Sequence, residues 1–354
     1  MDIIYELFYF VVVLTVIVIV HELGHLIAAK KFNVYCGEFS IGFGPALFKK
    51  KFKETTLAIR ALPIGGYVQM AGEEDANGEM YDAIPLERCV NGIKPWKQAI
   101  IMGAGIFMNI VLALVIFTGI NLYNGVIRLP IDEVVVGEVV ANSPASKADF
   151  KANDKIVGIT YSDGTKHPIV DYQDLMEATT AEMGESIYEV ERDGKLVSLK
   201  LTPEKNPETG TIQAGVIIKA KTKEITMLEA VKYAFIDCVN SVKLITEALL
   251  NLFRGVGLEN LSGPIGIFKV TSQFSTQGFM AFFNLIAMLS LNLGVFNALP
   301  IPILDGGRIF ILIIEKIRGK KLSEKFITIT MNIGVFAIIA LMVFVTWQDI
   351  VKLF

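Results

Sequence analysis

Long apolar stretches alternate with polar segments along the chain, and four of them are long enough to cross a lipid bilayer, which takes about 20 residues of helix. They cover roughly residues 7–29, 99–122, 280–299 and 326–347, and the third ends in a proline-rich break. An even number of spans places both ends of a chain on the same side of a membrane. The pattern therefore predicts a polytopic α-helical membrane protein with four transmembrane helices.

The composition agrees with this prediction. Apolar residues make up 53% of the 354 residues and charged residues 19%, which is richer and poorer, respectively, than the average soluble protein. A net charge of −3 gives no reason to expect nucleic acid as a partner. The three cysteines form no C-x-x-C pair, so they indicate neither a disulfide framework nor a thiolate zinc site. Acidic residues precede the first stretch and no small-residue cleavage site follows it, so we expect it to be retained rather than removed as a signal peptide.

Lysine and arginine gather in two of the polar segments, one after the first span and one between the third and fourth. These residues are Lys30, Lys31, Lys49, Lys50, Lys51, Lys53 and Arg60, and then Lys316, Arg318, Lys320, Lys321 and Lys325. Short loops rich in lysine and arginine usually face the cytoplasm. We therefore expect both clusters on the cytoplasmic side, and both termini and the long middle region outside.

The middle region, roughly Ile131 to Lys221, has a different composition. Short β-type runs cover residues 134–140, 188–192 and 196–201, and residues 171–183 are predicted to form a helix. Asp193-Gly194 between two alternating runs is a strong hairpin signal. We expect a small, mostly β domain here, with His167 in one of its loops.

Two further segments border the predicted spans. Residues 57–62 and 67–70 are predicted to form two strands joined by residues 63–66. Such a hairpin either dips into the membrane, which we favour, or is the edge of a small soluble sheet, and its free edge could pair with an extended peptide. Residues 225–253 are amphipathic and are expected on the outer membrane surface, with a fifth span as the alternative.

The sequence His21-Glu22-Leu23-Gly24-His25 closes the first apolar stretch. On a helix, H-E-x-x-H places two imidazoles one turn apart on one face with a carboxylate beside them. This arrangement can hold zinc and supply a general base. The pattern is short, and structural histidines are the alternative. Ionisable side chains are rare in membrane helices unless they have a function or a partner, which favours a metal site.

Two histidines leave zinc short of a ligand, because catalytic sites use three protein ligands. Asp305 is the candidate for the third. It follows a helix interrupted by Pro300 and Pro302, and Gly306-Gly307 after it allow close backbone approach. An aspartate at such a break suggests a polar site, but capping of the next helix is an equal alternative from these residues alone.

The chain resembles the site-2 intramembrane metalloproteases over nearly its whole length, most closely the bacterial RseP-type enzymes with an external PDZ domain. The resemblance rests on His21 to His25 and on the segment from Asn297 to Gly306, which matches N-x-x-P-x-P-x-L-D-G. It implies that His21, His25 and Asp305 bind zinc (Zn2+) and that Glu22 is the catalytic base.

The resemblance also implies roles for residues outside the metal motif. Asn292 and Asn297 fall where the family holds the substrate backbone, and Tyr67 and Val68 fall in a membrane-reentrant β-element that presents substrate as a strand. Asn109 closes a G-x-x-x-N motif in the second span. A helix contact of small residues and a direct role in the site remain equal alternatives for this motif.

Residues 137–145 and 153–157 resemble a PDZ domain. The sequence departs from the pattern at Asp149 and Asn153, where glycine is usual. Both residue types tolerate the left-handed backbone conformation better than most, so we keep the PDZ-like fold as the expectation.

The expected organisation follows from these segments. Residues 1–30 form the first transmembrane helix, 31–97 a cytoplasmic-side loop and the β-element, 98–123 the second helix, 124–222 the extracytoplasmic PDZ-like domain, 223–278 an amphipathic surface helix and linker, 279–315 the third helix, and 316–354 a cytoplasmic loop and the fourth helix.

The expected function is zinc-dependent intramembrane endoproteolysis in a bacterial plasma membrane, with the active site near the cytoplasmic face. The expected partners are the lipid bilayer and membrane-protein substrates such as anti-sigma factors or signal-peptide remnants. A non-catalytic scaffold with a peptide-binding PDZ domain and a transporter with a broken helix are the alternatives.

Overall fold

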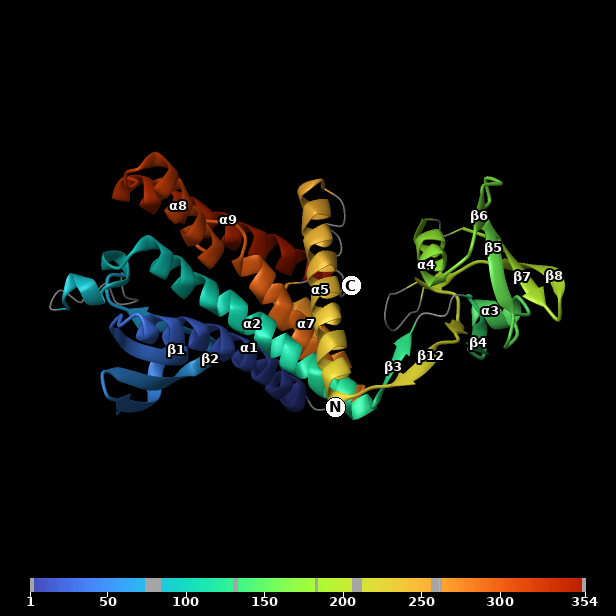
Figure 1. Cartoon of the computed structure of the whole chain (residues 1–354), viewed down its shortest axis with the longest axis horizontal. Coiled ribbons are helices and arrows are strands. Elements are labelled where there is room, and N and C mark those ends of the chain that lie inside the picture. Colours follow the sequence, from blue (N-terminus) through green and yellow to red (C-terminus); the bar gives the residue numbers. More distant parts are fainter. Residues whose placement is uncertain are drawn as a thin grey trace. The chain divides into compact units, whose positions relative to one another are not determined.

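The computed structural model describes residues 3–73, 84–129, 133–181, 184–205, 212–255, 261 and 263–351 (Figure 1). Ile131 and Met183, which bound two predicted segments, lie outside them. The chain divides into a unit of Met1–Tyr123 and Met227–Phe354, here called the membrane unit, and Asn124–Thr226, here called the inserted unit.

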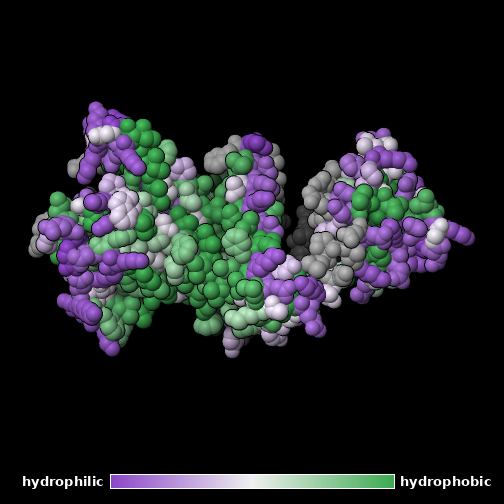
Figure 2. Space-filling model, viewed as in Figure 1, coloured by the Kyte–Doolittle hydropathy of each residue, from purple (hydrophilic) through white to green (hydrophobic). Residues whose placement is uncertain are grey.

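Among the described residues, four helices are long and apolar enough to cross a membrane. They are α1 (Ile3–Lys31), α2 (Pro95–Asn124), α7 (Phe279–Asn297) and α9 (Glu324–Val351), and each coincides with one predicted span. Figure 2 shows hydrophobic residues, in green, over much of the surface of this unit. An apolar surface of this extent suits lipid rather than water, and the four predicted apolar helices are confirmed.

The third predicted span breaks as expected. Helix α7 ends at Asn297, and α8 (Asp305–Arg318) begins after a segment that contains Pro300 and Pro302. Because proline lacks an amide hydrogen and clashes with the preceding turn, the helix cannot continue through it. The break brings Asp305 to the first turn of a new helix.

Helix α5 (Met227–Phe253) is amphipathic and is not among the described helices apolar enough to cross a membrane. It packs against α2 and α7 through a cluster that includes Phe117, Cys238 and Leu291. A further helix, α6 (Pro264–Thr276), packs beside α1, with the rings of Phe10 and Phe268 5.7 Å apart.

The predicted pairing of residues 57–62 with 67–70 is wrong. Both segments lie in one strand, β2 (Thr55–Met70), whose antiparallel partner is β1 (Cys36–Phe52). The tight turn is Lys53-Glu54, where Phe52 faces Thr55 and Lys53 has a φ of 54°. Pro63 to Gly66 form a bend within β2, with Gly65 at a φ of 103°, so the proline and glycines that suggested a turn mark a kink instead.

The kink folds this hairpin back on itself. Residues 36–41 pair with 66–70 on one side, and on the other side with 56–59, which in turn face 48–51. Segment 66–70 is therefore an edge of the small sheet, with one side free of strand partners among the described residues. Two short 3-10 turns, η1 (Leu86–Arg88) and η2 (Val90–Gly92), follow before α2.

The inserted unit is mostly β. Its strands are β3 (Val126–Leu129), β4 (Val136–Val139), β5 (Lys155–Thr160), β6 (Lys166–Pro168), β7 (Ser186–Arg192), β8 (Lys195–Leu201), β9 (Glu204–Lys205), β10 (Ile212–Gln213), β11 (Val216–Ile218) and β12 (Lys221–Glu224), and its helices are α3 (Pro144–Lys147) and α4 (Tyr172–Ala181). One sheet has the order β6-β5-β7-β8, and β4 with β11, β3 with β12, and β9 with β10 form pairs. The strands and α4 enclose one apolar core that includes Val136, Ile159 and Val190.

In the inserted unit the predicted hairpin turn is confirmed, whereas the predicted loop position of His167 is wrong. Asp193 and Gly194, at φ angles of 51° and 75°, join β7 to β8 with Arg192 opposite Lys195, as a type I′ hairpin turn requires. Asp149 and Asn153 have φ angles of 62° and 76°, so both adopt the left-handed conformation at positions where glycine is usual. His167 lies on the exposed strand β6 rather than in a loop.

Candidate metal centre and active site

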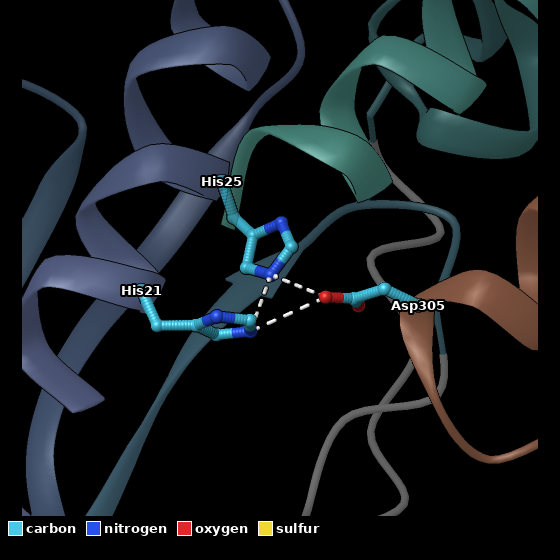
Figure 3. Close-up of side chains that lie close together, drawn as sticks. All are labelled: His21, His25 and Asp305. Atoms are coloured by element: carbon cyan, nitrogen blue, oxygen red, sulfur yellow. Dashed lines mark hydrogen bonds and ion pairs between the residues drawn. The ribbon is translucent and has the colours of Figure 1, made fainter. Parts of the chain in front are cut away.

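Three side chains converge where α1 meets the start of α8 (Figure 3). His21 and His25 lie one turn apart on α1, and their Nε2 atoms are 3.2 Å from each other. Asp305 Oδ2 lies 3.2 Å from His21 Nε2 and 3.3 Å from His25 Nε2. In the described part of the chain, these residues are the one group of three or more histidine, cysteine or acidic side chains that could hold a metal ion.

The spacing of these atoms fits zinc. Bonds of about 2.0–2.1 Å in a tetrahedral site put neighbouring ligand atoms about 3.3 Å apart, and the three measured separations agree. Asp305 Oδ2 is buried and accepts no hydrogen bond from any described residue, so a cation would satisfy it. Three protein ligands also leave the fourth position that catalytic zinc sites keep for water or substrate.

Backbone contacts between helices hold the histidines in place. His25 Nδ1 lies 2.8 Å from the main-chain oxygen of Ile101 on α2, and donation there leaves Nε2 free to bind a metal. The two helices touch at glycine, since a Cβ on Gly24 would lie 2.3 Å from Ala104 O. Only hydrogen fits at this contact, which explains how α2 comes close enough to support both rings.

Glu22 faces a cavity of about 370 Å³ that both histidines and Asp305 also line. Tyr67, Val68 and Asn297 line the same cavity, and a Cβ on Gly66 would lie 3.7 Å from Glu22 Cγ. The free edge of the sheet therefore lies directly against the candidate base. Asn292 lies half-buried on α7 and is not among the residues that line this cavity.

Polar side chains of the hairpin hold Tyr67 in place through hydrogen bonds. Its hydroxyl donates to Glu38 Oε1 at 2.8 Å, and Arg60 Nε donates to the same carboxylate oxygen at 3.2 Å. Burial acts to raise the pKa of Glu38, but the hydrogen bonds from Arg60, Tyr67 and Lys49 outweigh it and hold this pKa below its usual value. A charged Glu38 thus anchors the strand that borders the cavity.

Sequence reasoning missed an ion pair at the cavity. Arg308, one turn after Asp305 on α8, pairs with Glu73, which follows β2, and both line the cavity together with Met102. The spacing of Asp305 and Arg308 places them on one helix face and could have indicated Arg308. No local pattern indicates Glu73.

The structure gives Asn109 both kinds of contact that its motif left open. Its side chain is fully buried, and Nδ2 lies 3.1 Å from His21 Nδ1. The residue therefore contacts a candidate ligand as well as the neighbouring helix α7, where Ser290 Oγ donates to its main-chain oxygen at 2.9 Å.

Comparison with known proteins agrees with this geometry. The sequence profile of peptidase family M50 matches residues 9–341. The chain belongs to peptidase family M50, the site-2 proteases. A Clostridium acetobutylicum protein named as a zinc metalloprotease is 35% identical over 95% of this chain and 94% of its own length. The regulator of sigma-W protease RasP of Bacillus subtilis is 31% identical over 98% of each chain. This M50 peptidase is thus a zinc-dependent metalloprotease of the site-2 type and a multi-pass membrane protein.

Proposed function

We propose that this M50 peptidase cleaves peptide bonds of membrane-protein substrates within the bilayer, and that His21, His25 and Asp305 are its zinc ligands. The observation that carries the proposal is the position of the candidate ligands and base. Two ligands and Glu22 lie on α1, a helix long and apolar enough to span a membrane, and the third lies beside the break after α7. Ionisable groups at such a place indicate a function.

Glu22 acts as the general base and then the general acid. When bound, zinc acts as a Lewis acid toward the scissile carbonyl and the attacking water. Glu22 takes a proton from that water as its oxygen adds to the carbonyl carbon, and the proton passes to the leaving amine as the C–N bond breaks. Water is consumed and one carboxyl and one amine end are produced, so the carboxylate of Glu22 is regenerated.

The substrate backbone must leave its helical state before cleavage, because helix carbonyls are bonded within the helix. The free edge of β2 at residues 66–70 can pair with an extended substrate segment. Tyr67 and Val68 place this edge at Glu22, and Asn297 supplies an amide to the same cavity. Asn292, on the same helix, is proposed to hold the substrate chain farther from the metal.

The substrates that fit are single-span membrane proteins, such as anti-sigma factors, or the remnants of signal peptides. We place both termini and the inserted unit outside the cell, with the active site near the cytoplasmic face. The inserted unit is proposed to be a PDZ-like domain. Its hairpin at Asp193-Gly194 and the left-handed Asp149 and Asn153 support this assignment.

The experiment is cleavage of a single-span substrate by the purified chain in detergent, compared with Glu22→Gln. The variant should lose about 10²- to 10⁴-fold in rate, because the base is gone, while its zinc content stays unchanged. Glu6→Gln, on the same helix, is the control and should cleave normally. Equal rates for Glu22→Gln and the wild type would leave a non-catalytic role as the better account.

A further inference from the structure

Asn109 is a buried polar residue inside an apolar helix that none of the proposed chemical steps uses. It is 0% exposed, and its Oδ1 makes no hydrogen bond with any described residue. Its Nδ2 lies 3.1 Å from His21 Nδ1, on the side of the ring opposite the candidate metal position. The residue therefore contacts the back of one ligand.

If His21 binds the metal through Nε2, Asn109 must accept a hydrogen bond from Nδ1 of the same ring. A neutral imidazole carries one proton, and Nε2 must be free of it to bind a metal. Nδ1 then carries the proton and needs an acceptor. His25 shows the same arrangement, because its Nδ1 has the main-chain oxygen of Ile101 at 2.8 Å. Among the described residues, the hydrogen-bond partner of His21 Nδ1 is the Asn109 amide and not a main-chain oxygen.

A half-turn of this amide supplies the acceptor. The two ends of the amide have nearly the same size, so the half-turn exchanges Nδ2 and Oδ1 within the same space. With the proton on Nδ1, the present orientation would face a donor with a donor, whereas the turned amide accepts the bond. Oδ1 gives up no hydrogen bond in the exchange.

We propose that Asn109 is a positioning residue for the metal: its amide oxygen accepts the His21 Nδ1 hydrogen, fixes the ring with Nε2 toward Asp305, and so sets zinc affinity. The proposal rests on the ligand set given under the proposed function. Partners behind ligating histidines change metal affinity by about 10- to 100-fold when removed, and a purely structural contact with α7 would not.

The experiment measures zinc affinity of the full chain in detergent by competition with a chelator of known strength. Asn109→Leu keeps the branching of the side chain and removes the acceptor, and should weaken zinc binding by about 10- to 100-fold. Asn109→Asp keeps an acceptor oxygen and should bind zinc at least as tightly as the wild type. Ser290→Ala, which loses only the bond to the Asn109 main chain, should bind zinc normally.

Metal-free unfolding of each variant separates positioning from folding. A positioning role predicts that Asn109→Leu differs from Asn109→Asp in zinc affinity and in the visible spectrum of the cobalt-loaded protein, beyond any difference between the metal-free forms. If the leucine variant does not fold, Asn109→Ala gives the same comparison. Equal zinc affinity in the leucine and aspartate variants would overturn the proposal.

The ligand set is tested in parallel. Asp305→Ala should lose zinc whatever the role of Asn109. If Asp305→Ala loses zinc and Asn109→Leu does not, only the positioning role fails. If Asp305→Ala keeps wild-type affinity, the ligand set itself is wrong.

Discussion

Gly105 and His25 are so close that a Cβ on the glycine would lie 2.5 Å from His25 Nε2. The same Cβ would lie 2.8 Å from His21 Nε2. Real side chains do not approach this closely, so α2 can back the metal site only with a residue that has no side chain. In the G-x-x-x-N motif, Gly105 thus leaves room for the two imidazoles and Asn109 makes a polar contact with one of them.

Gly105→Ala should displace both imidazoles from the metal position. Displacement of about 1 Å costs about a hundredfold in rate, so we expect at least this loss in substrate cleavage together with weaker zinc binding. Gly119→Ala is the matched control, because Gly119 lies on the same helix and no atom of the described residues would lie within 4 Å of its Cβ. Normal zinc content in Gly105→Ala would contradict the steric account.

The Arg308–Glu73 ion pair should shape the cavity without binding the metal. Arg308→Gln is expected to reduce kcat/KM while zinc content stays normal, because the pair joins the first turn of α8 to the segment after β2. Residues in direct contact couple, so exchanging the charges in an Arg308→Glu, Glu73→Arg double variant should recover part of the loss. Arg318→Gln, exposed on the same helix, should have no effect. Failure of the double variant to exceed either single variant would argue against the pair.

The structure shows why some features could be predicted from the sequence. The i, i+4 spacing of His21 and His25 and the length of the apolar stretches depend only on helix geometry. Asp305 was found because the prolines before it and the family pattern around it are local signals. For these residues, the neighbouring sequence is enough to predict where they lie.

Contacts between distant segments could not be predicted in this way. The Pro63 to Gly66 segment has the composition of a turn, yet it forms a kink, because β1 is long enough to pair with both halves of β2. Glu73 and Arg308 lie 235 residues apart, and Asn109 and His21 lie 88 apart. Only the packed fold shows that these side chains meet.

The resemblance to RseP-type enzymes implies that the inserted unit is a size filter, which excludes substrates with bulky outer domains, and deleting the unit tests this role. Gly125 O accepts a hydrogen bond from Ile225 N at 3.1 Å, so removing residues 126–224 leaves two ends that a short glycine linker can join. We expect the deleted form to cleave a substrate with a bulky outer domain that the full chain rejects. The same deletion combined with Glu22→Gln should be inactive. Continued rejection of the bulky substrate would rule out the filter.

The ion pair of Arg192 and Asp154 should dominate the acid stability of the inserted unit. Asp154 is fully buried, and Arg192 donates to both of its oxygens at 2.7 Å. Burial acts to raise the pKa of Asp154, but the bonds from Arg192 and the Lys151 amide outweigh it and lower this pKa. The stabilisation is thus present above the unfolded pKa of about 3.9 and is lost as pH falls through the lower folded value.

Arg192→Met should reverse this dependence. It leaves a buried carboxylate without its partner, which costs about 3–5 kcal/mol of unfolding free energy near neutral pH. Burial is the largest influence on the Asp154 pKa, and without Arg192 only Lys151 opposes it. The Asp154 pKa is therefore expected to rise, so the folded form binds the proton more tightly and stability rises on acidification. Hydrogen exchange of residues 133–201 in the full chain, corrected for the intrinsic effect of pH on exchange, measures the loss of stability near neutral pH and its change with pH. Lys200→Met breaks an exposed ion pair with Glu185 on the same sheet and should change little. An Arg192→Met variant that weakens in acid as the wild type does would show that other groups control the transition.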